Sequence, residues 1–211
     1  MQNTLLLPLI FNRAVCVFDE VKTGFRSALG GYQSIVGVKP HLSVFGKAIA
    51  NGYPLGIIGG RKEIVGLFDS PDPQKRVLIA GTYNAHPINT IAAITTLNIL
   101  KDPEVYNHIQ NTSDKLYDGL EKIFSEKGIP ATISKNASAF CVYFSEQQPH
   151  DLHDILLHHD FSFDIRYRKA LIEKSIYHFP VACKQGSVSY AHTKEDIGKT
   201  LEVTREVLKL I

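Results

Sequence analysis

Short apolar runs, separated by turns rich in glycine and proline, dominate the first part of the chain. Residues 14–18 are rich in β-branched and aromatic side chains, which predicts a strand buried on both faces. Residues 42–45 and 55–60 predict two further strands, and the glycines of the latter allow close backbone approach. Residues 77–80 are also strand-like. This pattern is typical of part of a parallel α/β sheet.

Helical periodicity replaces these runs from His86 onward. A helix is expected to begin at His86 with Pro87 in its first turn, and Asp102 and Pro103 should end it. Residues 104–127 then form an amphipathic segment. Its apolar side chains recur at helical spacing, namely Val105, Ile109, Leu116, Leu120, Ile123 and Phe124.

Strands and helices alternate in the rest of the chain. The last helix, residues 194–211, should begin after Thr193, a good N-cap, with Glu195 and Asp196 in its first turn. The change of pattern predicts an α/β portion at residues 1–104 and a smaller α+β domain at residues 105–211. The other elements expected there are strands at 139–144 and 187–190 and helices near 150–159 and 167–175.

Composition describes an ordinary globular protein. The chain has 211 residues, 44% of them hydrophobic, and a net charge of +2, which gives no reason to expect nucleic acid as a partner. The apolar run at residues 5–11 is too short to span a membrane and contains Pro8, so no membrane association is expected. It also lacks the features of a signal peptide, which makes the cytoplasm the expected location.

The cysteines and histidines predict no metal site. Cys16, Cys141 and Cys183 are few and far apart, which argues against disulfides or zinc, and Cys16 and Cys141 are expected to be buried thiols. The nine histidines form no ligand pattern. We therefore expect no bound metal.

The strongest chemical signal is the pair Asp19 and Lys47. Each follows a predicted strand, and the two residues are 47 − 19 = 28 positions apart. Pyridoxal phosphate requires a lysine for its Schiff base and a carboxylate against its pyridinium nitrogen. The pair therefore suggests this cofactor.

Three segments extend that signal. Residues 19–26, Asp-Glu-Val-Lys-Thr-Gly-Phe-Arg, residues 45–56 around Lys47, and residues 81–87, Gly-Thr-Tyr-Asn-Ala-His-Pro, resemble the ordered motifs of class III, pyridoxal-phosphate-dependent aminotransferases. Gly24-Phe25-Arg26 and residues 189–197 are similar to the branch of glutamate-1-semialdehyde 2,1-aminomutases and their aminotransferase relatives. The resemblance runs from about Ala14 to the C-terminus.

The resemblance implies roles for four residues. Lys47 would form the Schiff base and move the proton between the substrate Cα and the cofactor, and Asp19 would keep the pyridine nitrogen protonated. Val21 would press on one face of the ring. Thr82 would bind the cofactor phosphate, usually that of the other subunit of a dimer. The plain alternatives are a solvated lysine, a turn aspartate, a core valine and a helix-capping threonine.

The resemblance also implies a fold of type I, that of pyridoxal-phosphate-dependent transferases, of which this chain would be the C-terminal half. Residues 1–104 would be the C-terminal part of the large cofactor-binding domain, with a partial sheet and helices, and residues 105–211 the small α+β domain. The family's N-terminal half is missing, so apolar surface and strand edges should be exposed. A truncated chain, a split enzyme completed by a partner chain, and a decayed remnant would each explain this.

The expected function is amino-group transfer between a small-molecule amino donor and a keto or aldehyde acceptor, in a homodimer or with a partner chain that supplies the missing half. One alternative is intramolecular transfer, as in glutamate-1-semialdehyde 2,1-aminomutase, and another is an inactive fragment or assembly partner. Two residues depart from the family pattern. Asn51 stands where glycine is common, and His86 stands where asparagine is common.

Overall fold

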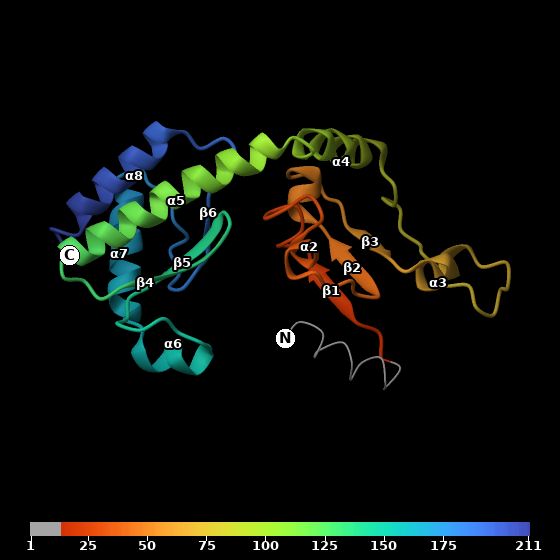
Figure 1. Cartoon of the computed structure of the whole chain (residues 1–211), viewed down its shortest axis with the longest axis horizontal. Coiled ribbons are helices and arrows are strands. Elements are labelled where there is room, and N and C mark those ends of the chain that lie inside the picture. The colour runs from red at the N-terminus through yellow and green to blue at the C-terminus, as the bar shows by residue number, and fades with distance from the viewer. Residues whose placement is uncertain (1–13) are drawn as a thin grey trace. The chain divides into compact units, whose positions relative to one another are not determined.

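The structure is a computed structural model that describes residues 14–211, so the apolar run at 5–11 lies outside the described residues. The chain divides into two compact units, one extending to Tyr106 and the other from Asn107 to Ile211. Figure 1 shows the elements of each unit. The interpretation of these units as a large-domain portion and a small domain stays a prediction.

A three-stranded sheet organises the first unit. It contains β1 (Val17–Glu20), β2 (Leu42–Phe45) and β3 (Ile57–Gly60) in that order (Figure 1). β1 and β2 are parallel, whereas β3 runs antiparallel to β2. The prediction of β2 is confirmed, but a fully parallel sheet is wrong. Residues 46–56 form too short a connection for the crossover that a parallel partner requires.

Two strand predictions need correction. β1 begins and ends later than residues 14–18, and its burial on both faces is wrong, because Val15 and Val17 are 55% and 49% exposed. Residues 77–80 form no strand, and Leu78 is 83% exposed. Apolar character predicts burial only where another element covers the side chain, and no such cover exists for these residues within positions 14–211.

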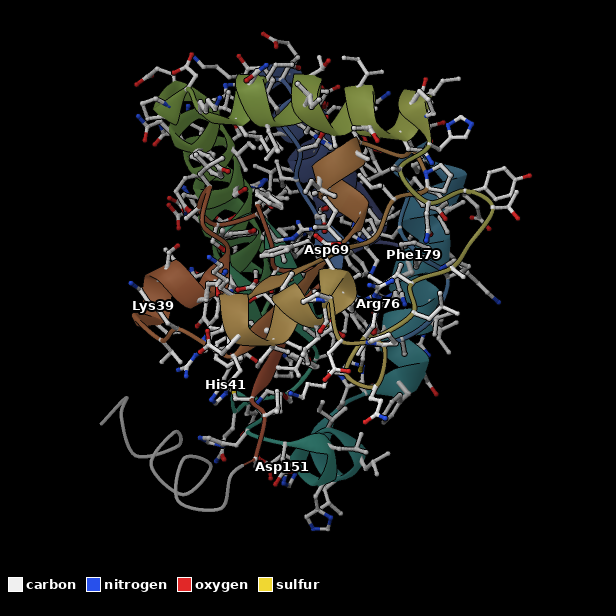
Figure 2. All side chains as sticks on the ribbon, turned by 90° about the vertical axis from the view of Figure 1, so that its right-hand side faces the viewer. Lys39, His41, Asp69, Arg76, Asp151 and Phe179 are labelled. Carbon is white, nitrogen blue, oxygen red and sulfur yellow. The ribbon has the colours of Figure 1, made fainter. Side chains whose placement is uncertain are left out.

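One hydrogen bond fixes the approach of β1 to β2. The Cys16 backbone N–H donates to His41 Nδ1 at 2.9 Å, just before β2 begins. His41 is labelled in Figure 2. This bond supplements the backbone bonds from His41 and Leu42 to the Cys16 carbonyl oxygen. The start of the parallel pair is therefore held by side chain and backbone together.

Helices connect and cover the strands of the first unit. The longest, α4 (Pro87–Leu100), begins as predicted, with His86 as N-cap and Pro87 in the first turn. Its Ala93 packs with Ile49 and Ala50 in a small buried cluster. The remaining helices are short: α2 (Tyr32–Val36), η1 (Lys47–Ala50), α3 (Lys62–Val65) and η2 (Gly66–Asp69).

The second unit has its own sheet and core. β4 (Thr132–Asn136), β5 (Ala139–Tyr143) and β6 (Gly186–Ser187) form an antiparallel sheet in that order. Phe140, Val142 and Phe144 pack into one apolar cluster with side chains of α5, α7 and α8. The helices are α5 (Pro103–Glu126), α6 (Leu152–His158), α7 (Phe161–Glu173) and α8 (Lys194–Val207).

Local sequence signals set the helix boundaries of this unit. The amphipathic helix predicted at 104–127 corresponds to α5. α8 begins after Thr193 as predicted, and Thr193 and Asp196 form a reciprocal capping box. The hydrogen bonds from Thr193 lower the pKa of the Asp196 carboxyl. α8 ends at Val207, earlier than expected. Within positions 14–211, no helix is long and apolar enough to cross a membrane.

His178 introduces a titratable group into the second unit's core. Its ring lies 6.4 Å from the ring centroids of both Phe140 and Tyr167. The pKa of the imidazole is lowered from 6.5 to about 4, mainly by burial and also by the Arg168 guanidinium, while Asp164 opposes the shift. The folded unit therefore holds His178 neutral at physiological pH.

The second unit should lose stability in mild acid. Because the folded pKa lies below the unfolded one, the unfolded chain binds the proton more readily between pH 6.5 and 4. The contribution of neutral His178 to the free energy of unfolding should be complete above pH 6.5. It should fall by about 3 kcal/mol as the pH approaches 4. Urea unfolding followed by circular dichroism should show this loss. His178→Phe should abolish it and His158→Phe, on an exposed residue, should retain it; equal pH profiles for all three proteins would contradict the assignment.

Candidate functional site

The carboxyl ends of β1 and β2 form one edge of the first sheet. In the parallel register Asp19 pairs with Val44 and Glu20 with Phe45. Lys47 follows β2 by two residues, so Asp19 and Lys47 reach this edge from adjacent strands. Neighbouring strands of a sheet lie about 4.8 Å apart. Carboxyl ends of parallel strands are where open α/β sheets bind their ligands.

Asp19 presents a carboxylate at this edge. The residue is exposed, and its Oδ1 accepts the Val21 backbone N–H at 3.0 Å. That bond closes a tight turn and uses one carboxylate oxygen, so the second oxygen can accept a hydrogen bond from another group. Asp19 therefore combines a defined orientation with an exposed negative charge.

Lys47 is the first residue of η1 and adopts an uncommon backbone conformation. Its φ is +47°, in the left-handed region that side chains other than glycine seldom occupy. The following residues Ile49 and Ala50 are buried, and they anchor η1 against α4. Within residues 14–211 no hydrogen bond or ion pair holds the Lys47 amine, and the side chain is exposed. Residues in sparsely populated backbone conformations cluster at functional sites.

Val21 belongs to the same edge. A Cβ placed on Gly46 would lie 3.4 Å from Val21 Cγ1, so Val21 packs against the residue that precedes Lys47. The structure thus places Asp19, Val21 and Lys47 at one edge of the sheet, and their roles stay a prediction.

Thr82 lies apart from these three residues in the described chain. It occupies the exposed segment 81–86 before α4, where Ala85 has a φ of +52°. Within residues 14–211 no hydrogen bond joins Thr82 to Asp19, Val21 or Lys47. A role for Thr82 at this edge of the same chain is therefore not supported by any contact.

The start of α4 borders a small cavity near Thr82. Asn89 Nδ2 donates to the Pro54 carbonyl oxygen at 2.6 Å, which ties α4 to the turn after η1. A cavity of about 280 Å³ is lined by Pro54, Tyr83, His86 and Asn89. His86 Nδ1 is buried there without a hydrogen-bond partner among the described residues.

The backbone conformation at position 51 explains why asparagine can stand where the family commonly has glycine. Its φ and ψ are 47° and 48°, a left-handed C-cap of η1, and its backbone N–H donates to the Ala48 carbonyl oxygen at 3.2 Å. Glycine is the residue best suited to this conformation, and asparagine is the side chain that tolerates it best. The asparagine therefore preserves the backbone that a glycine would allow.

Sequence reasoning did not single out Glu20 as a functional residue. Glu20 follows Asp19 directly, but alternation along β1 turns its side chain to the opposite face, where it is 1% exposed. A buried carboxylate needs donors, and these come from residues far along the loop. Strand alternation alone could have indicated that Asp19 and Glu20 differ in environment.

A second polar cluster lies in the second unit. His159 Nε2 is 3.2 Å from Asp164 Oδ2, and Asp164 Oδ1 accepts from Arg168 Nε at 2.5 Å. His159, Asp164 and Cys183 are close enough to ligate one metal ion. His159 and Asp164 already have partners, however, because His159 Nδ1 accepts the Phe144 N–H and Asp164 Oδ2 accepts the Cys183 N–H.

This cluster is best explained as a satisfied core network. Burial raises the pKa of the Cys183 thiol to about 11, which disfavours the thiolate that a metal would require. Cys141 is buried as predicted, whereas Cys16 is only half-buried, and all three cysteines are free.

Sequence comparison identifies the family. Residues 11–162 match the profile of the family described as aminotransferase class III. The chain belongs to the class III aminotransferase family. The motif around Asp19, the Lys47 segment and the Gly-Thr segment all lie inside the matched region.

Class III relatives align along nearly the whole chain. Glutamate-1-semialdehyde 2,1-aminomutase of Thermodesulfovibrio yellowstonii is 35% identical over 195 residues, which are 92% of this chain and 45% of the relative. The enzyme of the same name from Desulforudis audaxviator is 36% identical over 93% of this chain and 44% of its own length. The chain therefore spans less than half the length of these curated relatives.

Solved structures confirm the fold. An omega-transaminase from Sphaerobacter thermophilus superimposes with a TM-score of 0.88 and 27% identity, over 99% of this chain and 48% of its own. A glutamate-1-semialdehyde aminomutase from Pseudomonas aeruginosa shares the fold, with a TM-score of 0.84 at 17% identity and coverage of 99% and 47%. The expected type I fold, represented by its partial sheet with helices and an α+β unit, is confirmed.

The Asn51 backbone provides a test of local strain. Asn51→Ala should lower the free energy of unfolding by about 1 kcal/mol, because alanine is disfavoured in the left-handed conformation. Asn51→Gly should leave the stability unchanged or raise it slightly. Thermal or urea unfolding of the two variants measures this difference, and an alanine variant as stable as the glycine variant would rule out the strain.

Proposed function

We propose that the chain is the C-terminal half of a pyridoxal-phosphate-dependent enzyme that transfers amino groups, with Lys47 as the residue that forms the Schiff base. The observation that carries the proposal is the shared sheet edge of Asp19 and Lys47. A carboxylate and an amine on adjacent parallel strands fit the two ends of this cofactor's reactive ring.

The donor set fits pyridoxal phosphate. Asp19, with its second oxygen directed to the edge, would hold the protonated ring nitrogen, and Val21 would contact the ring face. When bound, the cofactor supplies an electron sink for negative charge that develops at the substrate Cα.

Lys47 would hold and move the proton at the substrate Cα. An amine accepts that proton only when it is neutral, and burial favours the neutral form. Lys47 is exposed in the described chain. The required cover must therefore come from another part of a longer polypeptide or from a partner chain.

Thr82 would supply a hydroxyl group to the cofactor phosphate of a second subunit. Among residues 14–211 no hydrogen bond joins Thr82 to Asp19 or Lys47, which favours this role over a role within one chain. We therefore infer a homodimer, or a partner chain that supplies the part of the relatives' length that this chain does not span. The proposed location is the cytoplasm. The substrates would be a small-molecule amino donor and a keto or aldehyde acceptor.

A second candidate function is intramolecular amino transfer. It is favoured by the aminomutases that are 35% and 36% identical to this chain. The two reactions share the Asp19 and Lys47 chemistry, and product analysis separates them, because a mutase needs no external acceptor. A non-catalytic fragment or assembly partner would bind no cofactor through Lys47.

The cofactor test uses the visible absorbance that pyridoxal phosphate acquires when it is bound to a lysine. The chain should show this band, Lys47→Ala should lose it completely, and Lys62→Ala should keep it, because Lys62 is an exposed lysine on α3. No Lys47-dependent band would refute cofactor binding by this chain alone. Candidate amino donors should then bleach the band, and a band that no donor alters would contradict transamination.

The dimer test uses the exposed apolar face of α4, where Ile88, Ile91 and Ile99 are 54–57% exposed. A charge on this face should prevent its burial between subunits. Light scattering at micromolar concentration should show a dimer for the chain and a monomer for Ile91→Lys. Leu156→Lys on α6, at an equally exposed leucine, should remain dimeric. A monomeric parent chain would contradict the homodimer.

A further inference from the structure

Glu20 holds the loop that follows β1 through a buried carboxylate. Its side chain accepts the Tyr32 N–H at 3.1 Å, the Gln33 N–H at 2.7 Å and the Thr23 hydroxyl. Three donors satisfy a charge that would otherwise be costly to bury. Because the donors lie three to thirteen residues ahead, one side chain closes the whole segment from Val21 to Gln33.

Two glycines leave room for this closure. Gly31 has a φ of +75°, and a Cβ there would lie 2.9 Å from Glu20 Oε1. A Cβ on Gly24 would lie 2.6 Å from the Glu20 carbonyl oxygen, which accepts the Gly24 N–H at 2.8 Å. Larger residues at either position would push the loop away from Glu20. The loop is therefore built around both the backbone and the side chain of this residue.

The same network reaches the second strand of the site. Gln33, whose N–H binds Glu20, accepts the Ser43 hydroxyl through Oε1 at 3.0 Å. Ser43 is buried on β2, four residues before Lys47. Hydrogen bonds thus connect Glu20 at the end of β1 with Ser43 near the start of β2, on the face opposite to Asp19.

We propose that Glu20 is a positioning residue, which fixes the turn after β1 so that Asp19 and Val21 are held against the cofactor ring. The turn matters because the Val21 N–H donates to Asp19 Oδ1, and the next turn closes on the Glu20 carbonyl oxygen. Glu20 faces away from Asp19 and does not touch the cofactor. The inference rests on the proposed function of Asp19.

A structural role alone makes a different prediction. If Glu20 only stabilises the fold, its replacement lowers the free energy of unfolding and leaves cofactor affinity of the folded protein unchanged. If Glu20 acts through Asp19, its replacement weakens cofactor binding in a protein that has Asp19 and has no further effect in the Asp19→Asn variant. A double-mutant cycle separates these cases.

The test measures the dissociation constant of pyridoxal phosphate from the Lys47-dependent visible band. Glu20→Gln keeps the size but has one acceptor oxygen, and it should raise the dissociation constant about tenfold, or 1.4 kcal/mol. Thr23→Val, which removes one donor, should raise it about threefold or less. Glu63→Gln, on an exposed glutamate of α3, should have no effect. In an Asp19→Asn background Glu20→Gln should change nothing further, and additive losses would overturn the proposal.

A second readout needs no cofactor. Amide hydrogen exchange by NMR should show that Glu20→Gln speeds exchange of the Val21 N–H about tenfold, because its partner Asp19 Oδ1 is no longer held in register. An unchanged Val21 exchange rate would overturn the positioning role whether or not the chain binds cofactor. Absence of the visible band with fast Val21 exchange in Glu20→Gln would instead count against the proposed function alone.

Discussion

The parallel pairing of β1 with β2 is the constraint on which the candidate site depends. Side chains at the ends of parallel strands meet at one edge, so Asp19 and Lys47 become neighbours although 28 positions separate them. An antiparallel pair would place these two ends at opposite edges. The bond from the Cys16 N–H to His41 Nδ1 and the Glu20 network secure this pair at its start and at its end.

Each of the three segments of the candidate site contains a backbone conformation that side chains disfavour. Phe25, Lys47 and Ala85 all have positive φ angles, and each lies in a different motif. Such conformations persist only where surrounding contacts determine them. For Phe25 those contacts include the Tyr106 hydroxyl on its carbonyl oxygen and the Phe45 ring at 5.2 Å. The site is therefore positioned by packing as much as by hydrogen bonds.

Local signals made much of the fold predictable. The β2 strand, the Pro87 start of α4 and the Thr193 cap of α8 depend on residues within a few positions, and they were predicted correctly. The burial of β1 and the strand at 77–80 were wrong, because they depend on distant cover. Likewise, Asp19 and Lys47 were found from motifs, whereas the role of Glu20 depends on donors at positions 32 and 33.

Covering the first unit and, in the proposed function, desolvating Lys47 are the same physical problem. Among the described residues the buried apolar cluster of the first unit is small, comprising Ile49, Ala50 and Ala93, while Val15, Val17 and Leu78 remain exposed. The second unit buries a much larger apolar cluster by itself. A surface that covers the first sheet would remove apolar area from water and water from the Lys47 amine together. In the proposed function, the stability of this unit and the desolvation of Lys47 would therefore depend on the same cover, which would link the folding of this unit to its chemistry.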